Sequence, residues 1–155
     1  MTHDILLFTH VLGATVLLGT GAGIAFLMVI SARSGDAALV AHVAGIVVLA
    51  DTLFTATAAL IQPVTGYLLA RDAGWPVSEG WVFWSLALYI FVGLFWLPVV
   101  WIQIRLRDIA IKARDTGTEL PAAFHQLYRI WFACGFPAFA AVMVILWLMI
   151  TKPSF

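Results

Sequence analysis

Charged residues are scarce in this chain: only 10% of its 155 residues are Asp, Glu, Lys or Arg, whereas 63% are hydrophobic. A soluble domain carries roughly 25% charged residues, because its surface has to stay hydrated. This chain has too little charge to coat a water-exposed shell, so we expect the lipid bilayer to be its main solvent and partner. The formal net charge is zero, which argues against a nucleic-acid partner.

Cysteine is almost absent as well, because Cys134 is the only one and lies inside an apolar run. A single cysteine excludes an intramolecular disulfide and a metal site built from several thiolates. We expect Cys134 to be a small packing residue. The sequence contains no nucleophile–base pair and no carboxylate cluster typical of a soluble hydrolase, and it leaves open whether the protein is an enzyme.

Four long hydrophobic runs make up most of the chain. Backbone polar groups cannot stay unpaired in lipid, so membrane crossings are helices or a closed barrel. A helix needs about 20 apolar residues to span the hydrocarbon layer, and these runs are too long and too unalternating for barrel strands. We therefore predict an all-α fold, a polytopic four-transmembrane-helix bundle that forms one membrane domain over residues 1–155, with helices at about 5–32, 38–70, 80–106 and 122–151.

Basic residues gather at one end of the predicted bundle, which we call the basic end. They flank the first–second and third–fourth helix connections, and they are Arg33, Arg105, Arg107, Lys112, Arg114 and Arg129. The opposite end, which we call the terminal end, has only Arg71 and Lys152. Because cytoplasmic loops carry the excess of Lys and Arg, we predict a cytoplasmic basic end and two periplasmic termini, in a bacterial inner membrane.

Asp51 interrupts the second hydrophobic run about a third of the way across the membrane, counted at the helical rise. An intramembrane carboxylate is costly and is by default a functional hypothesis. On a regular helical wheel, Thr55, Gln62, Thr65 and Gly66 fall within about 60° of Asp51. The spacing predicts one polar stripe that faces protein or water rather than lipid.

Further polar groups are expected near this stripe. Pro63 has no amide hydrogen, so the carbonyl of Ala59 loses its helical partner. On the third predicted helix, Ser85 and Tyr89 share a face with Trp96. These residues either form a functional site or join the helices by interhelical hydrogen bonds.

His10 is the most informative histidine, because Gly13 and Ala14 follow it at helical spacing. A membrane haem needs an imidazole nitrogen for its iron and space for a flat macrocycle. The pattern predicts haem b bound beside Gly13 and Ala14, with His10 as the metal ligand. Met143 and Met149, toward the matching end of the fourth helix, are the candidates for a second ligand. The alternative is a structural histidine held by hydrogen bonds.

Four segments carry a resemblance to a known family. They are THVLGATVLLG, DTLFTATAALIQPVTGYLLA, LYIFVGLFWLPVVWIQIRLR and WFACGFPAFAAVMVILWLM, the last followed closely by KP. Together with Asp51, Gln62-Pro63, Thr65-Gly66 and the stretch from Trp96 to Gln103, they resemble the bacterial predicted integral membrane proteins known as domain of unknown function 2269. The resemblance covers essentially the whole chain and implies the architecture, but no activity.

A more distant resemblance is to small haem-associated membrane proteins of the HemJ-type protoporphyrinogen oxidase and copper-resistance D kind. These also open with a helix bearing an early histidine, here His10, followed by a helix broken by Pro and Gly, here Thr52 to Gly66. In the HemJ type, a lysine on the third helix is implicated beside that histidine, and Ser85 stands at the corresponding position here. A hydroxyl cannot replace an amine, so the resemblance implies haem binding without the oxidase activity.

Three functions therefore stay open. The first is a b-type haem protein for redox or electron-transfer work, with His10 as an axial ligand. The second is a small carrier or proton-linked membrane protein that uses Asp51 and Gln62. The third is a non-catalytic subunit or assembly factor of a larger membrane complex. We expect a homodimer or a larger complex, because small residues such as Gly19 and Gly23 allow helices to approach closely.

Overall fold

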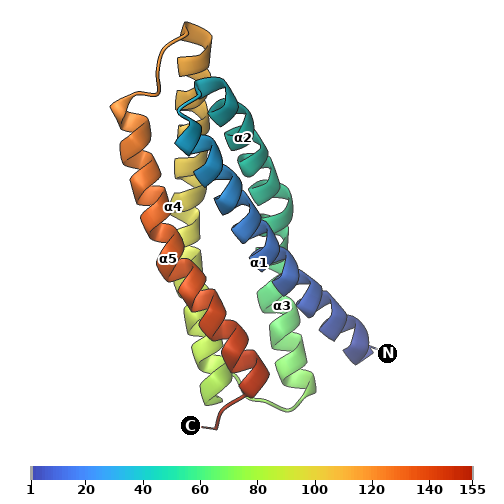
Figure 1. Ribbon diagram of the computed structural model, residues 1–155. Coiled ribbons are helices and arrows are strands. Elements are labelled where there is room, and N and C mark those ends of the chain that lie inside the picture. The colour runs from blue at the N-terminus through green and yellow to red at the C-terminus, as the bar shows by residue number, and fades with distance from the viewer. Residues whose placement is uncertain (1, 155) are drawn as a thin grey trace.

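The computed structural model describes residues 2–154, and nearly all of them are helical (Figure 1). In chain order the elements are α1 (Thr2–Ser34), α2 (Ala37–Ala50), the π-helical turn η1 (Asp51–Thr55), α3 (Ala56–Asp72), α4 (Gly80–Thr116) and α5 (Ala122–Thr151). Because α2, η1 and α3 form one continuous rod, the described residues contain four rods of 33, 36, 37 and 30 residues, each long and apolar enough to cross a membrane. The expected all-α fold with four spans is confirmed.

The observed helix bounds lie close to the predicted ones except at the end of α4. The predicted third helix ends at residue 106, whereas α4 continues to Thr116. The segment beyond residue 106 loses its apolar character but contains no Gly or Pro, so nothing stops the helix. Gly117 then ends it in the left-handed conformation, with φ at 64°, and its amide donates to the carbonyls of Ala113 and Arg114.

The turn between α1 and α2 is short and well defined. Gly35 adopts a positive φ of 71°, which a residue with a Cβ rarely does. Asp36 then caps α2, because its carboxylate accepts hydrogen bonds from the amides of Ala38 at 2.8 Å and Leu39 at 3.3 Å. This turn makes α1 and α2 antiparallel neighbours, so that α1 begins and α5 ends at the same end of the bundle (Figure 1).

The shared hydrophobic core lies in the half of the bundle toward the basic end. Its buried residues come from all four rods and are Ile24, Met28, Val40, Ala41, Ala44, Val47, Ile102, Leu106, Ala110, Ala113, Leu120, Phe124 and Trp131. The extension of α4 belongs to this core, since Ala110 and Ala113 are buried. Small side chains at these positions let the neighbouring helices approach closely.

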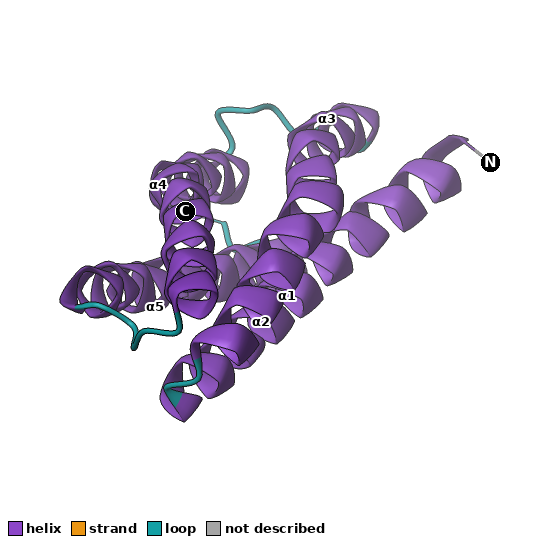
Figure 2. Cartoon of the chain, turned by 90° about the horizontal axis from the view of Figure 1, so that it is seen from above, coloured by secondary structure: helices purple, strands orange, loops and turns teal. Residues whose placement is uncertain are grey.

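Packing divides the rods into two groups that are joined at the basic end. One group is α1 with α2 and α3, and the other is α4 with α5, while α2 connects the groups by packing against α4. Figure 2 shows α4 and α5 beside the crossed pair formed by α1 and the α2–α3 rod. Because α3 makes little backbone contact with α4 or α5, the terminal half depends on side chains to link the groups.

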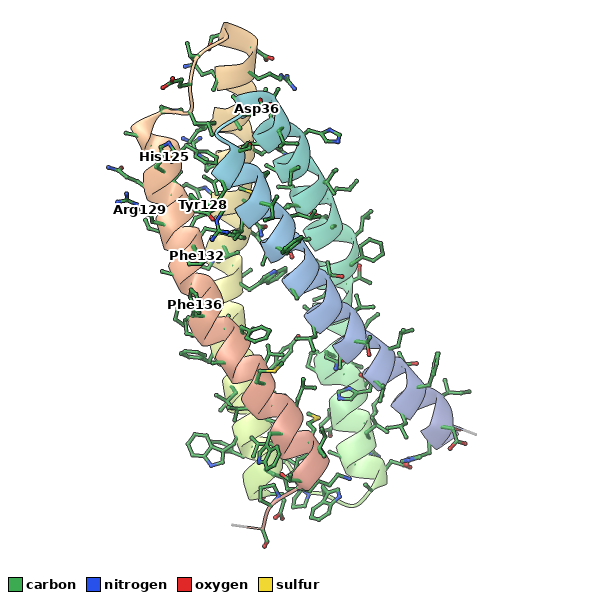
Figure 3. All side chains as sticks on the ribbon, in the orientation of Figure 1. Asp36, His125, Tyr128, Arg129, Phe132 and Phe136 are labelled. Carbon is green, nitrogen blue, oxygen red and sulfur yellow. The ribbon has the colours of Figure 1, made fainter. Side chains whose placement is uncertain are left out.

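Aromatic rings run along α5 from the basic end into the span. Phe124, Tyr128, Phe132 and Phe136 follow one another at four-residue spacing, with ring centroids 6.3, 6.2 and 5.1 Å apart. Figure 3 shows His125 and Arg129 beside the upper part of this row. Residues four apart lie on one helical face, so the row gives α5 a continuous aromatic surface that starts among basic residues.

Three side-chain contacts hold the terminal end together. Trp75 packs edge-on against Trp81 with centroids 5.7 Å apart, and the Lys152 ammonium lies 5.9 Å from the Trp81 ring. His3 on α1 and Asp72 on α3 form an exposed hydrogen bond, with Nδ1 and Oδ2 2.5 Å apart. The first two contacts tie the α3–α4 loop and the end of α5 to α4, and the third ties α1 to α3.

The close approach of α1 and α3 generates a test of the fold. A Cβ placed on Gly66 would lie 3.0 Å from Cε1 of His10, whereas one on Gly19 would meet nothing within 4 Å. We expect Gly66→Leu to push α1 from α3 and to destabilise the protein by about 1–3 kcal/mol, the usual range for overpacking. Thermal unfolding in detergent measures the effect.

Gly19→Leu is the matched control for this substitution, because it adds the same side chain to the same bundle at an open position. We expect Gly19→Leu to unfold at the temperature of the unmodified protein or above it. Equal losses of Tm in both variants would contradict the close contact at Gly66.

Candidate functional site

The polar residues of the predicted stripe form two separate sites. The first, which we call the His10 site, lies between α1 and α3 and contains His10, Gln62 and Thr65. The second, which we call the Asp51 site, lies between the η1 turn and α4 and contains Asp51, Thr55 and Trp96. The sequence predicted neither the division nor the pairing of His10 with half of the stripe.

His10 is fixed on α3 through its Nδ1 atom, which lies 2.9 Å from the Thr65 hydroxyl oxygen. That hydroxyl has a single hydrogen, which it donates to the carbonyls of Ile61 at 3.0 Å and Gln62 at 3.2 Å. When the hydroxyl donates to either carbonyl, it accepts from His10, and Nδ1 then carries the ring hydrogen. In this tautomer Nε2 keeps its lone pair.

Nε2 of His10 is open to a ligand. The side-chain hydrogen bond recorded for His10 among the described residues uses Nδ1, and Nε2 is not among the enclosed polar atoms that lack a partner. The Cε1 edge of the ring lies against Gly66, where a side chain would crowd it. A half-buried imidazole with one nitrogen anchored and the other free has the arrangement that metal-ligating histidines use.

Gly13 contacts Gln62 across the α1–α3 interface. Gln62 is only 9% exposed, and its Oε1 has no hydrogen-bond partner. A Cβ on Gly13 would lie 2.6 Å from that oxygen, so the absence of a side chain at Gly13 makes room for Gln62. Ala14, the next residue, is half-buried. Whether Gly13 and Ala14 also lie beside a macrocycle stays a prediction.

A second metal ligand beside His10 stays a prediction. Met143 and Met149 lie on α5, whose main packing partner is α4 rather than α1. Among residues 2–154, no group of three or more His, Cys, Asp or Glu side chains could hold a metal ion. His42 and His125 are exposed near the basic end.

Asp51 is buried near the middle of its rod, with only 3% of its surface exposed. The indole N–H of Trp96 on α4 points between its two carboxylate oxygens, with N···O distances of 3.3 and 3.2 Å. The Thr55 hydroxyl lies beside the carboxylate but does not meet hydrogen-bond geometry with it. One neutral donor is thus the only hydrogen-bond donor to Asp51 among the described residues.

The η1 turn explains why the predicted stripe divides. In this turn the amide of Ala56 donates to the carbonyl of Asp51, five residues back instead of four. A π-helical turn takes up an extra residue, so the residues before and after it no longer keep the phase of a regular helix. Asp51 consequently bonds to α4, while Thr65 bonds to α1.

The carbonyl freed by Pro63 also has a partner from another helix. The Tyr89 hydroxyl on α4 donates a hydrogen bond to the backbone oxygen of Ala59. Ser85 on the same helix is buried, but its hydroxyl donates to the carbonyl of Trp81 in its own helix at 2.7 Å. Tyr89 and Trp96 therefore join the two groups of rods, whereas Ser85 does not form such a link.

Two residues of the sites gave a weak signal in the sequence. Trp96 shares a face with Ser85 and Tyr89, but nothing in its neighbourhood marks it as the partner of Asp51. Thr65 was predicted as a member of the polar stripe, but the sequence does not mark it as the partner of His10. The η1 turn gave no signal, because its residues Asp51–Thr55 continue a helix of ordinary appearance.

The bond from Tyr89 to Ala59 generates a test by double-mutant cycle. Interhelical hydrogen bonds in membranes contribute about 0.6 kcal/mol on average and at most about 1.7 kcal/mol. We expect Tyr89→Phe to destabilise the protein by about 1 kcal/mol, because the Ala59 carbonyl then lacks any partner. Reversible unfolding in mixed detergent measures this loss.

Pro63→Ala supplies the second arm of the cycle, because the alanine introduced at this position has an amide hydrogen to donate to the Ala59 carbonyl. In that background we expect Tyr89→Phe to cost almost nothing, which gives a coupling energy near the whole of the single-variant effect. Equal costs in both backgrounds would mean that Tyr89 acts through packing and not through this bond.

Comparisons with known proteins give a family but no close relative. The family described as predicted integral membrane protein (DUF2269) matches residues 4–153. No curated protein matches the chain. No solved structure matches it either. The more distant resemblance to HemJ-type proteins therefore rests only on the residues quoted for it.

Proposed function

This chain belongs to the family of predicted integral membrane proteins DUF2269, and we propose that it binds haem b through Nε2 of His10 and takes part in electron transfer. The observation that supports this proposal is the hydrogen bond that holds Nδ1 on Thr65. Second-sphere acceptors of this kind orient ligating histidines and fix their tautomer. The other buried polar groups among the described residues lack a comparable nitrogen that is both oriented and free.

Each residue of the His10 site has a distinct part in this proposal. His10 supplies the ligand atom, Thr65 orients the ring, and Gly66 leaves space for its Cε1 edge. When bound, a haem supplies one-electron redox chemistry whose potential depends on the axial ligand and its surroundings.

The orientation of the bundle decides which side of the membrane the His10 site faces. His10 lies in the first third of α1, toward the terminal end, and the six basic residues lie at the opposite end. By the bias of basic residues toward the cytoplasm, we propose that both termini and the His10 site are on the periplasmic side of a bacterial inner membrane.

Cysteine labelling tests this orientation. In a Cys134→Ser background, we expect Ser154→Cys to react with a membrane-impermeant maleimide added to intact spheroplasts. A cysteine at exposed Thr118, in the loop after α4, serves as the control and should react only after lysis. The reverse pattern would place the termini in the cytoplasm and would reject the proposed orientation.

Absorption spectroscopy tests the proposed cofactor. We expect the protein purified in detergent from haem-replete cells to be red, with a Soret band that shifts on reduction. His10→Ala should lose this band, because the ligand atom is removed. His42→Ala and His125→Ala serve as controls and should keep it, because both residues are exposed at the other end.

Variants at Thr65 test the proposal while the proposed iron ligand His10 stays in place. We expect Thr65→Val to lower haem affinity about 10- to 100-fold, the usual cost of losing a second-sphere partner, while Thr65→Ser restores it. Haem titration of the apoprotein measures the affinities. A colourless preparation that takes up no added haem would contradict the proposal, as would an unchanged affinity in His10→Ala.

A further inference from the structure

The buried carboxylate of Asp51 has no recorded partner of opposite charge among the described residues. Its carboxylate is 3% exposed near the middle of a membrane-spanning rod, and the Trp96 N–H is shared between its two oxygens. One neutral donor cannot offset the cost of taking a carboxylate out of water. Buried charges are normally paired with an opposite charge, and the salt bridges among the described residues include none to Asp51.

The titratable side chains of the surrounding elements do not supply that charge. Between the charged ends of the bundle they are His10 on α1, His42 on α2, Tyr67 on α3 and Tyr89 on α4. His10 is bonded to Thr65 and Tyr89 to the Ala59 carbonyl. His42 and Tyr67 are exposed and make no recorded bond to Asp51.

The Thr55 hydroxyl is a second polar group beside Asp51 that has no partner in hydrogen-bond geometry. Thr55 is 8% exposed, and its hydroxyl oxygen is enclosed without a hydrogen-bond partner. The other membrane-facing threonines whose bonds are recorded donate to a carbonyl four residues back, as Thr52 does to Val48 at 2.7 Å. Thr55 instead leaves its hydroxyl next to the carboxylate, so two oxygen groups of one π-helical turn lie together with the Trp96 N–H as their one recorded donor.

From this arrangement we infer that Asp51 and Thr55 hold an exchangeable small monovalent cation, either a proton or Na⁺. The cation neutralises the carboxylate and satisfies the Thr55 oxygen, while Trp96 fixes the carboxylate from the other side. Binding forms no covalent bond to the protein other than the O–H bond when the cation is a proton. The site is separate from the His10 site, because Asp51 bonds to α4 and His10 to α3.

Infrared difference spectroscopy tests this inference on the full chain in phosphatidylcholine nanodiscs. One experiment steps the pH at constant Na⁺, and the other exchanges Na⁺ for choline at constant pH. We expect a carboxyl difference band that is absent in Asp51→Asn and retained in Asp115→Asn, whose carboxylate is exposed at the basic end. A response to pH alone identifies the proton, and a response to Na⁺ identifies the metal ion.

Thr55 gives a second, milder variant in case Asp51→Asn does not fold. We expect Thr55→Val to shift the midpoint of the responding titration about fivefold, the effect of one lost hydrogen bond, and Thr55→Ser to restore it. Wild-type spectra that respond to neither step would overturn the inference, as would a response that survives in Asp51→Asn. The Soret band is read from the same samples, so loss of the haem and loss of the cation are distinguished.

Discussion

The structure depends on one constraint: inside a bilayer, each backbone or side-chain polar group needs a partner within the protein. The α2–η1–α3 rod departs from this rule at several places, among them the carboxylate of Asp51 and the carbonyl that Pro63 frees. Side chains of α4 reach both groups, because Trp96 donates to Asp51 and Tyr89 donates to the Ala59 carbonyl. The irregular rod is therefore stable beside α4, although the two helices make little backbone contact at this level.

The two halves of the bundle satisfy the constraint in different ways. Toward the basic end, small and apolar residues from all four rods pack into one core, and the buried alanines of α4 allow this close packing. Toward the terminal end, the two groups of rods are connected by individual side chains rather than by a shared core. In that half, polar residues therefore join the helices. The same residues are the candidates for binding a ligand.

Much of this arrangement could be predicted from the sequence, because it depends on composition along the chain. The four spans, the buried position of Asp51 and the freed carbonyl at Ala59 follow from hydropathy, charge and the chemistry of proline. The third span was placed at residues 80–106, whereas α4 continues to Thr116, because loss of hydropathy marks the edge of the membrane and not the end of a helix. The division of the polar stripe could not be predicted, since a helical wheel assumes a constant phase and the η1 turn breaks it.

The same dual use of polar residues decides how function can be separated from stability here. Thr65 bridges α1 and α3 and also orients His10, so its removal weakens the packing and the candidate ligand together. Serine at this position keeps the acceptor oxygen but loses the methyl group, whereas valine keeps the methyl-sized volume but loses the acceptor. A property that is lost in Thr65→Val but kept in Thr65→Ser depends on the acceptor oxygen and therefore on His10. A property that is lost in Thr65→Ser but kept in Thr65→Val depends on side-chain volume and therefore on the contact between the helices. The same reasoning applies to Thr55 beside Asp51. In each site, the serine and valine variants of one threonine therefore separate ligand chemistry from packing.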